Sequence, residues 1–380
     1  MNKTIKLCKS ELLILIFISI SATYFSGILR YILIAMATVI YFIIKNKTVL
    51  SISKTDRTYF YLILPPLFYV ILGVITSITH HSLNSYTFRY CIFILLPFAT
   101  ALILVMSTGN TYRLITAQFC VHAVIYIIRM CTIFLKSGFR MDLLESSQAF
   151  LFSLYSIYFL VNKKYKLLLF TVPFILLTNK RISFAGLALV LVLYMIITKF
   201  NKNYQKIIKL SFVAAAIIVI FYVWSIYSNT LTNLYARFNI MDMGRLKLYN
   251  IFKATSEFSL FYFGDGLGSV MNKLAIIRYP ITNLHSDWLM CYMEIGLLGL
   301  LIYLLLYYKI FKKFGNKNYM TLYLAIIYLF VIYLTDNVMI YINILIGFYT
   351  ITLSTIKVHI KNPLNEKTPT VPHKIKGDDI

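Results

Sequence analysis

Long apolar runs recur along the whole chain and constrain its fold more than any other feature. Many of them approach the about 20 residues that a helix needs to cross the ~30 Å hydrocarbon core of a membrane. In lipid every backbone polar group must be satisfied internally, so such runs can only be helices. The chain is therefore expected to be an all-α polytopic integral membrane protein, with a single transmembrane domain over residues 1–380. The predicted helices, about twelve in number, lie near 11–28, 31–44, 59–79, 90–106, 114–135, 148–161, 167–178, 182–198, 208–227, 287–308, 319–334 and 338–356.

The composition agrees with a membrane protein and excludes a soluble one. Apolar residues make up 60% of the chain and charged residues only 13%, whereas soluble domains carry about 25% charged residues. A net charge of +24 would indicate nucleic-acid binding in a soluble protein. Here the lysines and arginines lie in short segments between apolar runs, where the preference of positive charge for the cytoplasmic side explains them. We therefore expect these lysines and arginines to contact membrane lipid, and we expect no nucleic acid as a partner.

The distribution of positive charge predicts the orientation of the chain. Counted on alternate sides of the twelve predicted helices, 24 Lys and Arg lie on the side of both termini and 12 on the other side, with Arg129 inside a helix. The positive-inside rule then places both termini in the cytoplasm, including a cytoplasmic tail over 357–380. The only long loop, 228–284, lies between the ninth and tenth predicted helices and faces outward. In a bacterial inner membrane this loop is periplasmic.

Arginine is concentrated on the external side. The cytoplasmic positive residues are 22 Lys and 2 Arg, whereas the external ones are 5 Lys and 7 Arg. Arginine is preferred where a planar group must bind phosphate through two hydrogen bonds. Codon bias and chance are the alternative explanation for counts this small. The bias favours an external phosphate-binding function, with Arg237 and Arg278 among the residues expected to contact the substrate.

The external loop carries features of an ordered cap. It contains a helix-like stretch around Leu246 to Ala254, followed by a glycine-rich turn, GDGLG. A loop of this length between spans is usually functional or disordered, and its many aromatic residues argue against disorder. We expect a small ordered cap over the membrane mouth.

His285 closes this loop directly before an apolar helix. Ser286 or Asp287 can cap the first turn of that helix, which leaves the imidazole beside the positive end of the helix dipole. That position disfavours a second proton, so His285 should stay neutral and competent as a base near pH 7. The alternative is an interfacial histidine that only terminates a span.

Four stretches resemble, in their order and their common side, the O-antigen polymerase and ligase family of bacterial membrane glycosyltransferases. They are NKRISFAGLALVLVL, GRLKLYNIFKA, FGDGLGSV and LHSDWLMCYMEIGLLGL, within residues about 175 to 310. They contain an Arg that opens a helix, a loop Arg followed by an aromatic residue, a G-x-G turn, and a His before a helix with Glu-x-Gly. The sequence departs from the family at Asn179–Lys180, where small residues often precede the Arg. Lys180 is therefore either an additional anion-binding residue or an anchor at the membrane surface.

The resemblance implies a GT-C-like fold and a polymerase that joins oligosaccharide repeat units at the periplasmic face. Donor and acceptor would be linked to undecaprenyl pyrophosphate, and a chain-length regulator would be a possible protein partner. No cofactor is implied. Because Asp242, Asp265, Asp287 and Asp336 are isolated in the sequence, we also expect no metal and direct inverting displacement. The implied catalytic residues are His285, Arg245 and Arg181, and the implied substrate-binding residues are Lys180, Arg237, Arg278 and Glu294.

Two alternatives to the polymerase remain open from the sequence. An O-antigen ligase would use the same donor with a lipid A-core acceptor. A polysaccharide flippase would also have about twelve spans, but would carry charges along a path through the bundle. Away from the ends of the predicted spans, the only charged residues are Arg129 and Glu294. An intramembrane carboxylate is a functional candidate, although these two residues could equally form a structural pair.

Overall fold

The computed structural model of the protein describes residues 9–53, 57–138, 145–200, 204–239, 242, 244–280, 283–315 and 317–361. Within these residues the regular structure is entirely helical, as expected for an all-α protein. The part of the predicted tail beyond Lys361 lies outside the described residues.

Among the described residues, six helices are long and apolar enough to cross a membrane, judged by length and composition. They are α2 (Gly27–Ser53), α4 (Ser85–Ser107), α5 (Thr111–Ser137), α9 (Arg181–Lys199), α10 (Tyr204–Tyr227) and α14 (Asp287–Phe314). The other apolar helices have apolar stretches of only 10–17 residues: α1 (Lys9–Tyr24), α3 (Leu64–Thr79), α7 (Gln148–Val161), α8 (Tyr165–Thr178), α15 (Met320–Ile332) and α16 (Ile342–Lys361). The predicted all-α class is confirmed, and the six candidate spans are compatible with a multi-pass membrane protein. Each of the twelve predicted ranges overlaps one of these helices.

Local chemistry explains where several helices begin. Asn84 caps α4, because its side-chain oxygen accepts hydrogen bonds from the backbone N–H groups of Tyr86 and Thr87 at 2.8 and 3.2 Å. The helix predicted from residue 59 begins later, at Leu64, and residues Arg57–Leu62 form a short 3₁₀ helix instead. The tandem Pro65 and Pro66 account for this difference, since proline is tolerated in the first turn of a helix but not in its interior.

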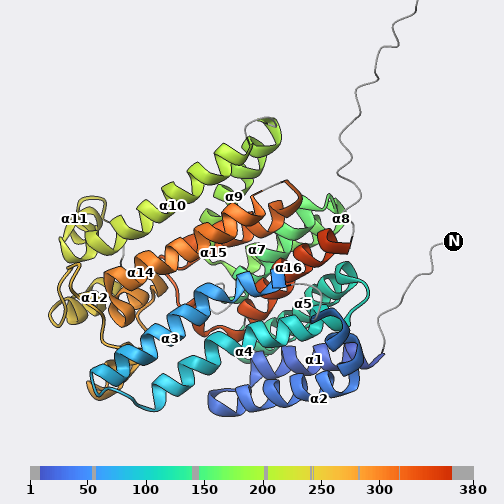
Figure 1. Cartoon of the computed structure of the whole chain (residues 1–380), viewed down its shortest axis with the longest axis horizontal. Coiled ribbons are helices and arrows are strands. Elements are labelled where there is room, and N and C mark those ends of the chain that lie inside the picture. The colour runs from blue at the N-terminus through green and yellow to red at the C-terminus, as the bar shows by residue number, and fades with distance from the viewer. Residues whose placement is uncertain are drawn as a thin grey trace, which may run out of the picture.

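The helices pack side by side in a bundle (Figure 1), with a buried apolar core and exposed apolar side chains on the outer helices. Helix α7 is buried along its whole length from Gln148 to Phe159, and α15 is buried almost as completely. The peripheral helices expose large apolar side chains instead, for example Leu13, Ile28 and Leu169. A surface of this kind is stable in hydrocarbon and not in water, which agrees with several of these helices lying in a membrane.

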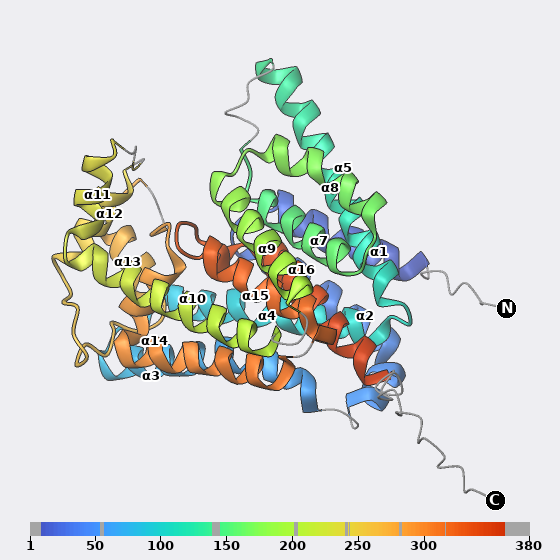
Figure 2. The ribbon, with the colours of Figure 1, turned by 90° about the horizontal axis from the view of Figure 1, so that it is seen from above.

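The long loop forms three short helices at one end of the bundle. They are α11 (Thr230–Arg237), α12 (Arg245–Lys253) and α13 (Ser269–Ile276), and α12 confirms the helix predicted around 246–254. In Figure 2 these helices gather at the left end, whereas the beginning of α1 and the end of α16 lie at the right. We call the loop segment with these three helices the cap.

Candidate active site

His285 occupies a strained turn directly before α14. Its φ is +54°, in the left-handed region that residues other than glycine seldom adopt. The next residue, Ser286, caps the helix by accepting a hydrogen bond from the N–H of Leu289 at 3.2 Å. The predicted capping of this helix by Ser286 is therefore confirmed. The Tyr249 hydroxyl of α12 donates to the His285 carbonyl at 3.3 Å. Strained residues held by their surroundings cluster at functional sites, and this one is half-buried.

A buried carboxylate, Asp336, lies next to this turn and binds Lys180. It follows α15 and is only 1% exposed. The Lys180 ammonium at the start of α9 lies 3.0 Å from Asp336 Oδ2 and 3.0 Å from Glu145 Oε1. The other Asp336 oxygen accepts from the Tyr341 hydroxyl at 3.1 Å. The backbone N–H of Asp287 donates to the Asp336 carbonyl at 3.2 Å, which holds this segment against the start of α14.

The charges around His285 act in opposite directions on its pKa. Burial lowers the pKa below its ordinary value of 6.5, the Asp336 carboxylate raises it, and the positive charges of Arg245 and Lys180 lower it, with a net decrease. The imidazole is therefore neutral near pH 7 and can accept a proton. A carboxylate close by also stabilises the imidazolium that forms once the proton is taken.

Lys180 stays charged in spite of its burial. Burial lowers the pKa of its ammonium, but the Asp336 and Glu145 carboxylates outweigh this effect and raise the pKa above the ordinary 10.5. The two carboxylates neutralise Lys180 within the protein. Its contact with them is structural in the first place, and its predicted role in binding the substrate stays a prediction.

The positive charge of Arg245 acts on His285, and Arg181 is exposed at the start of α9. Arg245 opens α12 behind Gly244, which adopts a φ of +82°. Arg181 is the first residue of α9 and follows Lys180 directly. Within the described part of the chain, the Arg181 side chain forms no hydrogen bond or ion pair. Both guanidinium groups therefore keep their donors for a ligand.

Arg237 and Arg278 lie farther out on the cap. Both side chains are exposed. The Arg237 guanidinium lies 6.0 Å from the centre of the neighbouring Phe238 ring, and Arg278 follows α13 in a left-handed conformation with a φ of +51°. The contacts seen among the described residues do not join either one to His285.

Glu294 lies deep in the protein and not in the neighbourhood of Arg129. It is fully buried; one oxygen accepts from the Tyr69 hydroxyl and the other from the backbone N–H of Gly268 at 3.0 Å. Arg129 donates instead to the Ser146 hydroxyl at 2.8 Å. The pair considered from the sequence is therefore not formed. Glu294 fixes the glycine-rich turn to α14, and its predicted contact with the substrate stays a prediction.

Helix α14 is broken at Gly296, and the glycine segment (Gly264–Gly268) fills the break. Gly296 has a φ of +70° inside the helix. The carbonyls of Met293 and Glu294 accept from backbone N–H groups of the glycine segment at 2.8 and 3.0 Å. A Cβ on Gly296 would lie 2.1 Å from the carbonyl oxygen of Tyr262. Irregular backbone at membrane depth is tolerated when it is buried in protein in this way.

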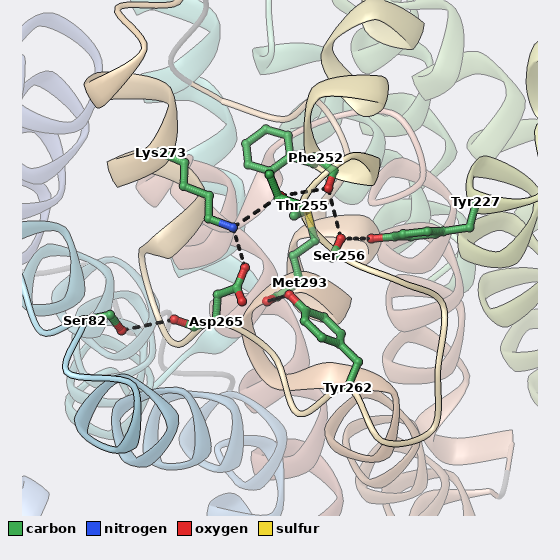
Figure 3. A network of polar contacts seen from close by, with 9 residues as sticks. All are labelled: Ser82, Tyr227, Phe252, Thr255, Ser256, Tyr262, Asp265, Lys273 and Met293. Atoms are coloured by element: carbon green, nitrogen blue, oxygen red, sulfur yellow. Dashed lines mark hydrogen bonds and ion pairs between the residues drawn. The ribbon is translucent and has the colours of Figure 1, made fainter.

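A polar network ties the glycine segment to the rest of the cap (Figure 3). Lys273 of α13 lies 2.6 Å from Asp265 in an ion pair and donates to the Thr255 hydroxyl at 3.4 Å. The Ser82 hydroxyl, between α3 and α4, donates to the Asp265 carbonyl at 3.1 Å. The cap is therefore attached to the bundle at several points, beside the helix that follows His285.

Sequence reasoning missed Asp336 and the two tyrosines that hold this site. Asp336 appeared isolated because its partner Lys180 is far away in the chain, and Tyr249 and Tyr341 are two of 31 tyrosines. One signal was present: Asp336 lies next to Asn337 between two apolar runs, where a carboxylate without a basic neighbour needs a distant partner. Comparison with protein-family models, with curated proteins and with solved structures finds no match to this chain.

Proposed function

We propose that this chain is a membrane glycosyltransferase of the O-antigen polymerase kind, which joins lipid-linked oligosaccharide repeat units. The observation that carries the proposal is the setting of His285. A half-buried histidine lies within electrostatic reach of a buried carboxylate, Asp336, and of two positive residues, Arg245 and Lys180, and its pKa is lowered. This combination suits removal of a proton next to a leaving group that gains negative charge. The four motif stretches identified in the sequence supply the substrate class.

In the proposed reaction the acceptor sugar hydroxyl attacks the anomeric carbon of the donor. The new C–O bond forms as the bond to pyrophosphate breaks, and undecaprenyl pyrophosphate leaves with the electron pair. His285 takes the hydroxyl proton, and Asp336 stabilises the resulting imidazolium. Arg245 and Arg181 stabilise the charge on the leaving group, where one well-placed donor is typically worth ~3–4 kcal/mol. The configuration at the anomeric carbon inverts.

The same proposal includes the placement in the membrane. It assigns twelve spans in a GT-C-like arrangement, both termini in the cytoplasm and the cap in the periplasm of a bacterial inner membrane. Two observations support it: the excess of positive charge on the side of the termini, and the position of the cap at the end of the bundle opposite the start of α1 and the end of α16 (Figure 2).

Reconstitution tests this function directly. Purified protein in proteoliposomes receives the lipid-linked oligosaccharide of its own host and, in a second sample, the same donor with lipid A-core. A ladder of lengthening glycans from the first sample supports the polymerase. Transfer to lipid A-core without a ladder indicates the ligase instead. Movement of the donor across the bilayer without any new glycosidic bond indicates a flippase and overturns the proposal.

His285→Ala is the matching variant. Removal of a general base typically costs about 10²–10⁴-fold in rate, so the ladder should vanish while protein level and donor binding persist. His81→Ala is the control, because His81 is an exposed histidine at the end of α3. The reaction should also continue in excess chelator; activity that returns only with an added divalent cation would contradict direct metal-independent displacement.

A further inference from the structure

A groove on the cap is lined by aromatic rings and polar groups together. It has a volume of about 380 Å³, within the ~300–1,000 Å³ that small-molecule sites span. It lies where the end of α10 meets the segment that follows α12. The residues that line this groove, which we call the aromatic groove, are Trp224, Tyr227, Ser228, Lys253, Ser256, Glu257 and Phe258.

Polar contacts and ring packing fix the walls of the aromatic groove. The hydroxyls of Tyr227 and Ser256 lie 2.7 Å apart, and Ser256 donates to the Phe252 carbonyl at 3.0 Å (Figure 3). The Phe258 ring stacks on Tyr292 of α14, with 5.6 Å between ring centres. The walls are therefore preformed, which reduces the entropy cost of binding a ligand.

The exposed groups in the aromatic groove are of the types that recognise sugars. Trp224 is 40% exposed, and the negative face of an aromatic ring attracts the polarised C–H groups on one face of a pyranose. The Glu257 carboxylate is exposed and forms no hydrogen bond or ion pair within the described part of the chain. The Lys253 ammonium donates to Asn229 at 2.5 Å and has further protons to donate. A carboxylate at this place disfavours an anionic lipid headgroup.

The aromatic groove is connected to the His285 site through α12. Arg245 opens this helix, Tyr249 contacts the His285 carbonyl, and Lys253 closes the helix at the groove. From Arg245 to Lys253 the helix rises by about 12 Å, at 1.5 Å per residue. A few linked pyranose rings cover this length.

We propose that the aromatic groove binds the oligosaccharide part of the substrate, several sugars away from the reacting bond. The proposal rests on the proposed function for its reaction, but binding itself can be measured without turnover. Trp224 stacks on one sugar face, and Lys253 and Glu257 hydrogen-bond the hydroxyls. A growing chain held here stays on the enzyme between additions.

The binding test uses the fluorescence of Trp224. The chain has two tryptophans, and Trp288 is fully buried, so acrylamide quenching reports on Trp224. The protein is placed in phosphatidylcholine nanodiscs, where no glycoside detergent competes. The probe is the lipid-free oligosaccharide released by mild acid from the host's own lipid-linked glycan. It should protect Trp224 from quenching, and Lys253→Ala combined with Glu257→Gln should weaken this protection roughly tenfold.

The control is Lys247→Ala, which removes an exposed lysine of the same helix that does not line the groove. It should leave the protection unchanged. The proposal is overturned if the oligosaccharide does not protect Trp224 of the wild-type protein from quenching. It is also overturned if phosphatidylglycerol nanodiscs without oligosaccharide protect Trp224.

Turnover supplies the second test. Trp224→Ala should shift the ladder to shorter chains, because the growing glycan is no longer held between additions. Phe261→Ala, an exposed ring of the cap outside the groove, is the control. A normal ladder from Trp224→Ala overturns the role in holding the chain. If the wild-type protein makes no polymer but the oligosaccharide still protects Trp224, the proposed polymerase function is wrong. The proposed glycan-binding site is then still supported.

Discussion

At His285, burial and the neighbouring charges oppose one another, and the balance decides what the imidazole can do. Burial, Arg245 and Lys180 favour the neutral form, whereas Asp336 favours the charged form. His285 must be neutral in the resting enzyme to act as a base, and burial and the two positive charges favour this form. In the transition state the imidazole gains a proton, and the Asp336 carboxylate stabilises its charge. Glu145 and Asp336 also neutralise Lys180, which leaves the arginines as the cations available to a pyrophosphate.

Asp336→Asn should change the pH dependence of the reaction. The neutral form of His285 is active, so activity falls as the pH drops through its pKa, which lies below 6.5. Asp336 raises that pKa, so its loss should move the acidic limb of the pH profile to lower pH. Turnover on the plateau should fall roughly tenfold, because about 1.4 kcal/mol of charge stabilisation is lost. The measurement is the initial rate of linkage formation between pH 4.5 and 8.

Glu145→Gln is the matched control for Asp336, since both carboxylates contact Lys180. The Glu145 side chain is 46% exposed, and exposed ion pairs contribute about 0–1 kcal/mol. Its rate and pH profile should stay close to those of the wild type. An unchanged acidic limb in Asp336→Asn would show that His285 titrates independently of this carboxylate.

Arg245→Lys and Arg181→Lys test the arginine donors at the leaving group. Lysine keeps the charge but not the planar fork that binds phosphate through two hydrogen bonds. Each variant should retain more activity than the corresponding alanine variant and less than the wild type. Arg30→Lys, near the start of α2 and outside the cap, is the control. Full activity of Arg245→Lys or of Arg181→Lys would show that this arginine contributes only its positive charge.

Among the elements, α14 links the membrane bundle to the candidate site. It begins with the capped turn after His285, breaks at Gly296 and accepts the glycine segment in the break. The sequence showed the glycines and the turn, because GDGLG is a local signal. It could not show that the turn inserts into a helix, because that contact joins segments distant in the chain.

Gly296→Ala should destabilise the protein through this contact. The new Cβ would lie 2.1 Å from the Tyr262 carbonyl, and overpacking of this kind typically costs about 1–3 kcal/mol. The Gly296 backbone, with a φ of +70° and a ψ of −179°, is essentially restricted to glycine, and a Cβ there adds about 1–3 kcal/mol. Gly27→Ala is the control, because Gly27 has a similar φ of +62° and no atom within 4 Å of its Cβ. The thermal midpoint should fall further for Gly296→Ala; equal midpoints would show that the α14 break adapts to a side chain.

At the scale of the whole molecule, the sequence predicted the all-helical class and the approximate positions of the apolar helices. Apolar runs report burial or lipid exposure directly, so each predicted range overlaps a helix. Boundaries were less predictable, as at Pro65 and Pro66, where a 3₁₀ turn precedes α3. The site was predicted only where it is local. The helix-capping role of Ser286 next to His285 was predicted from neighbouring residues. The Lys180–Asp336 pair, in contrast, depends on how α9 and α15 pack.

The orientation of the molecule in the membrane gives the last prediction. Reporter fusions after Tyr235, in α11 of the cap, should give the signal of an external reporter. Fusions after Gly315, which follows α14, should give a cytoplasmic signal. The physical reason is the charge around the second position: Lys309, Lys312 and Lys313 lie in the last turns of α14, where positive charge favours the cytoplasmic side. Substitution of these three lysines by glutamine should weaken the cytoplasmic signal, whereas the same substitution at Lys247 and Lys253 in the cap should not. Reversed signals at both positions would place His285 in the cytoplasm, away from any periplasmic acceptor, and would exclude the proposed reaction at the outer face.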